Sequence, residues 1–194
     1  MRVVRIVWRA TRLFAVVIVG IAVITADEVI RLLRFPPSSK VPDVVRWWHR
    51  AVCRALDLRV EIEGELAPKV MVVANHVSWL DIPVLGSLGR VVFLSKAEIR
   101  AWPVLGWLAA GGGTLFIRRG ANQVGEIAVE IERRLRSGRS VAVFPEGTTS
   151  NGTYVRRFFP RLFAIAQHPG IVVQPVALRY GNNDRPDPIA PWFD

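Results

Sequence analysis

A histidine and an aspartate five positions apart follow a short apolar run. These are His76 and Asp81, and the run is residues 70–74. Asp81 starts a segment that we expect to be helical, so the chain can fold back and bring the carboxylate to the imidazole. Such a pairing fixes the ring tautomer and stabilises the imidazolium, as a general base requires. The alternative is structural, because a histidine near an aspartate commonly caps a helix or lies in a core.

Two arginines, Arg118 and Arg119, leave a second apolar run beside the glycine-rich residues 111–113. Forked guanidinium groups at such a position can bind a phosphate. A solvated turn fits the same pattern equally well.

A third polar motif occupies residues 144–150, where an apolar run enters a turn. The turn carries Glu146, Gly147, Thr148 and two further hydroxyl side chains. A turn of this composition can cradle a polyol or a phosphate, although an ordinary turn is the alternative.

From residue 58 onward, short apolar runs alternate with helical segments, which predicts an α/β fold with a largely parallel central sheet flanked by helices. The predicted strands are residues 59–63, 70–74, 91–95, 113–117, 141–144 and 171–178. The predicted helices are residues 81–87, 103–110, 122–136 and 160–167. Ligands bind where the strands of such sheets end, and the three motifs fall at these places.

The N-terminal region has a different character. Residues 13–26 carry no charge, but this run is shorter than the roughly 20 apolar residues that a membrane span needs. Extending the run to spanning length includes Arg9 and Arg12. We expect a membrane anchor, spanning or half-buried, with its arginines on the cytoplasmic side. A cleaved signal peptide and a buried core helix are the alternatives.

A second helical segment, residues 42–56, follows the helix-breaking residues 36–39 and alternates tryptophans with basic residues. This pattern suits the headgroup region of a bilayer, and it equally suits a surface helix that packs its tryptophans on the domain. We therefore divide the chain into an N-terminal membrane-anchor and amphipathic helical region, residues 1–57, and a catalytic domain, residues 58–194.

Composition narrows the function classes. The 194 residues carry a net charge of +10 and are 51% hydrophobic, which excludes disorder. A single cysteine, Cys53, excludes an internal disulfide framework and a cysteine-rich zinc site.

The surplus of basic over acidic residues favours a polyanion as the binding partner. Because eleven of the basic residues lie around the apolar N-terminal run, we expect a membrane rather than nucleic acid. A basic membrane- or nucleic-acid-binding module without catalysis and a non-catalytic membrane scaffold stay as alternatives.

In order and spacing the motifs resemble the glycerolipid acyltransferase family, typified by lysophosphatidic acid acyltransferases. The resemblance covers roughly residues 58–180 and extends to a proline-centred strand around Pro175. The matching blocks are Asn75-His76…Asp81, Gly113…Phe116-Ile117…Arg119, Phe144 to Thr148, and Val172 to Ala177.

The resemblance implies transfer of an acyl chain from an acyl carrier protein or coenzyme A thioester to the hydroxyl of a lysolipid, at the cytoplasmic face of a membrane (the inner membrane, if the protein is bacterial). It makes His76 the general base and Asp81 its orienting partner. It assigns acceptor binding to Lys96, Arg119, Glu146, Gly147 and Thr148. A thioester is already activated, so we expect no cofactor and no metal. The sequence has no Gly-x-Ser-x-Gly elbow, and Cys53 lies away from the motifs, so we expect direct transfer without an acyl-enzyme.

Two departures from the family pattern bear on this expectation. Thr149 stands where the third block commonly has an arginine, which weakens the case for a phosphate acceptor and resembles members that acylate lyso-ornithine lipids. Because Lys96, Arg118 and Arg119 remain, we still place 1-acyl-sn-glycerol-3-phosphate first, giving phosphatidic acid, and lyso-ornithine lipid second. The chain also ends at Asp194, where family members usually continue, so we expect a fragment or a short member.

Overall fold

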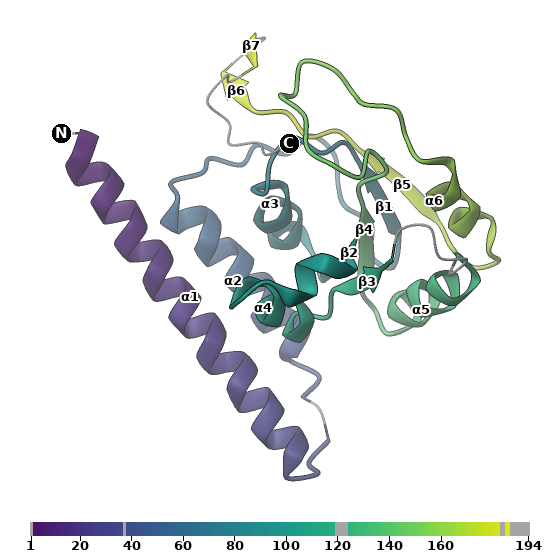
Figure 1. The fold of residues 1–194 in the computed structure, drawn as a ribbon, viewed down its shortest axis with the longest axis horizontal. Coiled ribbons are helices and arrows are strands. Elements are labelled where there is room, and N and C mark those ends of the chain that lie inside the picture. The colour runs from purple at the N-terminus through teal and green to yellow at the C-terminus, as the bar shows by residue number, and fades with distance from the viewer. Residues whose placement is uncertain (1, 37, 119–123, 183–184, 187–194) are drawn as a thin grey trace.

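The computed structural model describes residues 2–36, 38–118, 124–182 and 185–186 (Figure 1). Its centre is a sheet of five strands in the order β3-β2-β4-β1-β5, with every neighbouring pair parallel. The strands are β1 (Met71–Ala74), β2 (Val91–Lys96), β3 (Leu115–Ile117), β4 (Ser140–Val143) and β5 (Val173–Val176). Two short strands, β6 (Gly181–Asn182) and β7 (Arg185–Pro186), pair antiparallel outside this sheet. The predicted α/β fold with a parallel sheet is confirmed.

Helices cover both faces of the sheet (Figure 1). They are α1 (Arg2–Leu32), α2 (Val41–Ala55), α3 (Asp81–Leu88), α4 (Leu105–Gly111), α5 (Val124–Arg136) and α6 (Pro160–Ala164). Alternate residues of each strand point to opposite faces, so each strand serves two cores. Met71 and Val73 of β1 pack with Ile131 of α5 on one face, whereas Val72 packs with Leu85 of α3 on the other.

Residues 59–63 were expected to form a strand, and this prediction is wrong, because the segment is irregular in the structure. Charged residues alternate along it, and its largest apolar side chain, Ile62, is exposed. The segment therefore buries too little apolar surface to join a buried sheet.

Other predicted elements are present with different ends. The predicted helix 103–110 begins only at Leu105, after a 3₁₀ turn, Ala97–Ala101. The predicted helix 160–167 is α6 followed by a second 3₁₀ turn, Ile165–Gln167. The first two residues of the predicted helix 122–136 lie outside the described residues, and the rest is α5.

Helix α1 is long and apolar enough to cross a membrane by its length and composition. It lies along one side of the molecule (Figure 1), and most of its side chains are exposed. Within its described residues only Gly20 is fully buried, so the alternative of a buried core helix is wrong. A Cβ at Gly20 would come within 2.6 Å of Trp48 Nε1, so glycine permits the close approach of α1 and α2.

Polar contacts hold the two N-terminal helices to each other and to the domain. Trp48 Nε1 donates to the Val16 carbonyl at 2.8 Å, and Arg9 and Arg12 pair with Asp57 just after α2 at 2.9 and 2.8 Å. On the other side of α2, Arg46 and Arg50 donate to carbonyl groups in the last turn of α3. Cations are favourable at that end of a helix. Helix α2 therefore packs between α1 and α3, while its Trp47 is 49% exposed, so a position in the headgroup region stays a prediction.

Candidate active site

The imidazole of His76 and the carboxylate of Asp81 meet at the carboxyl end of β1. His76 Nδ1 lies 2.7 Å from Asp81 Oδ2, as the five-residue spacing predicts. The same oxygen accepts the backbone N–H groups of Val77 and Ser78, at 2.8 and 3.1 Å. The Asp81 side chain is fully buried, whereas the His76 side chain is 18% exposed. An ionised carboxylate only accepts hydrogen bonds, so His76 Nδ1 is the donor and Nε2 is left as the basic nitrogen.

The ring of His76 is also fixed from β4. Phe144, the residue after β4, stacks on it with centroids 4.1 Å apart and an interplanar angle of 15°. A hydrogen bond on one edge and a stacked ring on one face leave the imidazole a single orientation. This is the preorganisation that a general base needs.

Tyr180 completes the surroundings of Asp81, and sequence reasoning missed it. Its hydroxyl lies 2.6 Å from Asp81 Oδ1, the oxygen that His76 does not contact. Tyr180 follows β5 and is far from Asp81 in the sequence, so no spacing pattern pointed to the pair. Burial, followed by the neighbouring carboxylate, raises the pKa of Tyr180 above its usual range. The hydroxyl therefore stays protonated and donates.

Glu146 lies in the turn after β4 and is 3% exposed. Its two carboxylate oxygens each accept one backbone N–H, from His76 and from Arg156, both at 2.8 Å. The backbone of the same turn adds a bond from Ser150 N–H to the His76 carbonyl at 2.9 Å. Glu146 therefore holds the histidine loop against the turn. Gly147 has φ +67°, a conformation that favours glycine.

The other predicted site residues that the structure describes lie at or just after the carboxyl ends of neighbouring strands. Lys96 ends β2, Arg118 follows β3 and is exposed, and Thr148 is half-buried in the turn after β4. Arg119 lies outside the described residues. Asn75 exchanges two hydrogen bonds with the backbone of Leu178, at 2.9 and 2.7 Å, and so joins the loop after β1 to the segment after β5.

Replacing Glu146 with glutamine tests its role in the loop. The new amide nitrogen would face a backbone N–H and leave a buried donor unpaired, so we expect the free energy of unfolding to fall by about 1–3 kcal/mol. Denaturant unfolding measures this change. The exposed Glu61, whose side chain is 77% accessible, gives the matched control E61Q. Equal stability of both variants would contradict the proposed role.

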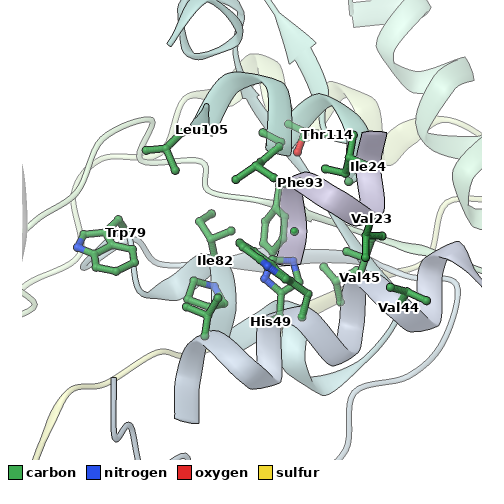
Figure 2. Close-up of a pocket in the computed structure, with 18 of the residues that line it drawn as sticks. Val23, Ile24, Val44, Val45, His49, Trp79, Ile82, Phe93, Leu105 and Thr114 are labelled. Atoms are coloured by element: carbon green, nitrogen blue, oxygen red, sulfur yellow. The ribbon is translucent and has the colours of Figure 1, made fainter. Parts of the chain in front are cut away.

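An apolar cavity of about 260 Å³ lies between the N-terminal helices, α4 and the sheet. Figure 2 shows Val44 toward one end, Trp79 toward the other, and Ile82 and Phe93 between them. Phe93 stacks with Phe144 at a centroid distance of 6.5 Å, and Phe144 stacks on His76. Two stacked rings, Phe93 in the cavity wall and Phe144 behind it, therefore connect the cavity to the imidazole. Sequence reasoning did not locate it, because its walls come from elements distant in the chain.

One titratable group, His49, lines the cavity. Its ring is packed edge-on against Phe93 and Trp48, and its Nδ1 has no partner within the described part of the chain. Burial lowers the pKa of His49 from 6.5 to about 4. The ring therefore stays neutral at the pH of a cell and adds no charge to the cavity.

The lowered pKa of His49 predicts an acid-sensitive fold. Between pH 6.5 and about 4 the unfolded chain takes up a proton that the buried ring does not, so the unfolded state gains stability as pH falls. We expect a loss of up to about 3 kcal/mol in the free energy of unfolding across this range. Unfolding curves at several pH values should show a smaller loss for H49L. The variant H168L, at a half-buried histidine outside the cavity, should keep the full loss.

Cys53 is buried in α2, and burial raises the pKa of its thiol. Because a thiolate is the reactive form, a buried neutral thiol is a poor nucleophile. Cys53 lies in α2, outside the three motifs, as expected. Among residues with a described position, no three His, Cys, Asp or Glu side chains form a group that could hold a metal ion.

Three comparisons place the chain among known proteins. A sequence model of the family described as Acyltransferase matches residues 58–179. A lyso-ornithine lipid O-acyltransferase of Pseudomonas aeruginosa is 44% identical over 193 residues, which are 97% of this chain and 74% of that protein. A lyso-ornithine lipid O-acyltransferase of Rhizobium meliloti is 41% identical, over 76% of this chain and 56% of that protein.

The similarity extends to proteins with another named acceptor. A 1-acyl-sn-glycerol-3-phosphate acyltransferase of Neisseria meningitidis is 40% identical, over 68% of this chain and 53% of that protein. The crystal structure of the 1-acyl-sn-glycerophosphate acyltransferase PlsC from Thermotoga maritima superposes with a TM-score of 0.59 at 23% identity, over 85% of this chain and 73% of that one. This chain thus spans about three quarters of the Pseudomonas protein and about half of the Rhizobium and Neisseria proteins.

Proposed function

The chain belongs to the acyltransferase family, and we propose that it moves a fatty acyl chain from a thioester to the hydroxyl of a lyso-ornithine lipid. The observation that carries this proposal is the 2.7 Å contact of His76 with Asp81, connected to an apolar cavity through the stacked rings of Phe144 and Phe93. A base and a site for an alkyl chain are the two parts that the reaction needs.

His76 is the general base in this proposal. Nε2 takes the proton from the acceptor hydroxyl as the oxygen attacks the thioester carbonyl carbon. The new C–O bond forms a tetrahedral oxyanion, whose collapse breaks the C–S bond. The imidazolium returns its proton to the departing sulfur. Asp81 stabilises the imidazolium while it exists. The thioester supplies the activated acyl group, so the reaction that we propose uses no metal and no cofactor.

The choice of acceptor rests on the third motif and on the relatives. Thr149 takes the place of the family's common arginine and is 7% exposed, so this position offers no cation to a phosphate. The relatives named for lyso-ornithine lipid match at 44% and 41% identity over most of the chain. We therefore place lyso-ornithine lipid ahead of 1-acyl-sn-glycerol-3-phosphate, reversing the order that the sequence alone favoured. The Neisseria relative supports the phosphate acceptor as the second candidate.

We assign the acceptor headgroup to Lys96, Arg119, Gly147 and Thr148. Glu146 has an indirect role in acceptor binding. Both of its carboxylate oxygens accept backbone N–H groups, so it fixes the shape of the turn rather than contacting the acceptor. The donor's alkyl chain, carried by acyl carrier protein or coenzyme A, is proposed to lie in the apolar cavity. Its walls are almost entirely aliphatic and aromatic, with His49 neutral among them.

We propose that residues 1–57 hold the catalytic domain, residues 58–194, at the cytoplasmic face of a membrane. Helix α1 exposes large apolar side chains along its length, among them Trp8, Phe14 and Ile18. Exposed apolar surface of this extent calls for a bilayer or a partner.

The test is a panel assay with purified protein in lipid vesicles. One labelled acyl donor is offered with lyso-ornithine lipid, with 1-acyl-sn-glycerol-3-phosphate or with lysophosphatidylcholine, and the donor is then exchanged between acyl carrier protein and coenzyme A thioesters. We expect lyso-ornithine lipid to be acylated fastest. Faster acylation of 1-acyl-sn-glycerol-3-phosphate would overturn the acceptor, and no transfer to any acceptor would overturn the proposal.

A further inference from the structure

Tyr180 joins the segment after β5 to the His76–Asp81 pair. Its hydroxyl is 2.6 Å from Asp81 Oδ1, and Asp81 Oδ2 receives the donors from His76, Val77 and Ser78. Tyr180 lies one residue beyond the range that the family model matches. The hydrogen bond is therefore a feature of this structure that the family match does not assign.

The four donors have different chemical consequences. The two backbone N–H groups hold only the Oδ2 end of the carboxylate, and they are present whatever the side chains are. The Tyr180 hydroxyl is a removable donor that withdraws negative charge from the carboxylate, because a hydrogen bond stabilises the anion that accepts it. Less charge on Asp81 means less stabilisation of a proton on His76.

We infer that Tyr180 is a positioning residue for acyl transfer, which orients the Asp81 carboxylate and limits the charge that it presents to His76. This inference rests on the proposed role of His76 as general base. The reaction uses the neutral imidazole as its base, and a carboxylate that presents less negative charge favours this neutral form.

The other described groups near the His76–Asp81 pair do not change the charge that Asp81 presents to His76. The carboxylate of Glu146 faces the loop, but both of its oxygens are occupied by backbone N–H groups. Cys53 of α2 is a buried neutral thiol because burial raises its pKa. Phe144 contributes an uncharged ring. Within the described residues, Tyr180 is thus the one side chain besides His76 that hydrogen-bonds the Asp81 carboxylate.

The test compares Y180F with Y154F. Tyr154 is the only other tyrosine and is 57% exposed, so it is a matched control. In Y180F we expect the acidic limb of the kcat profile to move up by about half to one pH unit with KM little changed. On that limb kcat should fall by up to about tenfold, whereas on the plateau above it kcat should be kept. Y154F should match the wild type. A fall in kcat without movement of the acidic limb would overturn the charge-limiting role, because a purely structural defect leaves the limb in place.

A second measurement does not depend on catalysis. The chain has three histidines, so the ¹⁵N-labelled imidazole of His76 can be assigned by its loss in H76A and followed through a pH titration. We expect its titration midpoint to lie at higher pH in Y180F than in the wild type. An unchanged midpoint would refute the inference about Tyr180. A shifted midpoint in a protein that transfers no acyl group would refute the proposed function and leave the hydrogen-bond relation intact.

Discussion

Replacement of His76 by alanine should lower the rate of acyl transfer by roughly 10²–10⁴-fold, the usual contribution of a positioned general base. Alanine cannot take the proton of the attacking hydroxyl, and the thioester alone reacts slowly with a neutral alcohol. The ring is partly exposed and its loss removes one stacking contact with Phe144, so the fold should survive. The assay is transfer of a labelled acyl group to lyso-ornithine lipid, with circular dichroism and vesicle binding measured on the same preparation.

The control for this prediction is H168A. His168 lies after the second 3₁₀ turn, where its Nδ1 is 3.5 Å from Glu132 on the face of the sheet that α5 covers. Its loss should leave turnover within a factor of about two. Full activity of H76A would contradict the catalytic assignment. If circular dichroism shows that H76A is unfolded, the same assay is done with the more conservative variant H76Q.

The second large effect is expected for D81N. The amide oxygen can keep the Oδ2 position and accept from His76, Val77 and Ser78, while the new NH₂ group faces Tyr180, whose hydroxyl can turn and accept. The hydrogen-bond count is preserved and the negative charge is lost. Without that charge the imidazolium formed during attack is less stable, so we expect kcat to fall by about 10²–10³-fold with the fold intact.

Steady-state kinetics with both substrates varied would separate kcat from KM in D81N. The matched control is D57N, at an exposed aspartate that pairs with Arg9 and Arg12 rather than with the site. D81N with wild-type kcat would show that the carboxylate only caps α3, which is the structural alternative that the sequence left open.

Much of the fold is predictable from local sequence. Residues 70–74 and 91–94 are unbroken apolar runs, and such runs form strands when both faces of a sheet are covered. The parallel arrangement follows from their alternation with helices. The segment 59–63 was predicted incorrectly, because β-branched residues alternate with charges there and the pattern does not reveal whether a buried edge is available.

The candidate site was predictable only in part. The contact of His76 with Asp81 is local, so spacing was sufficient to predict it. Tyr180 and the cavity arise from elements far apart in the chain, and no periodicity encodes such tertiary contacts. The carboxylate of Glu146 is another instance, since a sequence motif identifies the residue but not the backbone groups that occupy it.

The position of β5 and the segment after it, late in the chain order of the sheet, has a consequence for folding during translation. Among the described strands, β5 pairs with β1 alone. Leu178 and Tyr180, which follow β5, form hydrogen bonds with Asn75 and Asp81, respectively. A nascent polypeptide still lacking these residues can form β1 and α3 but cannot brace the loop between them. The loop that carries His76 therefore gains these hydrogen bonds only after residues 178–180 have left the ribosome, so translation delays the completion of the surroundings of His76 and Asp81.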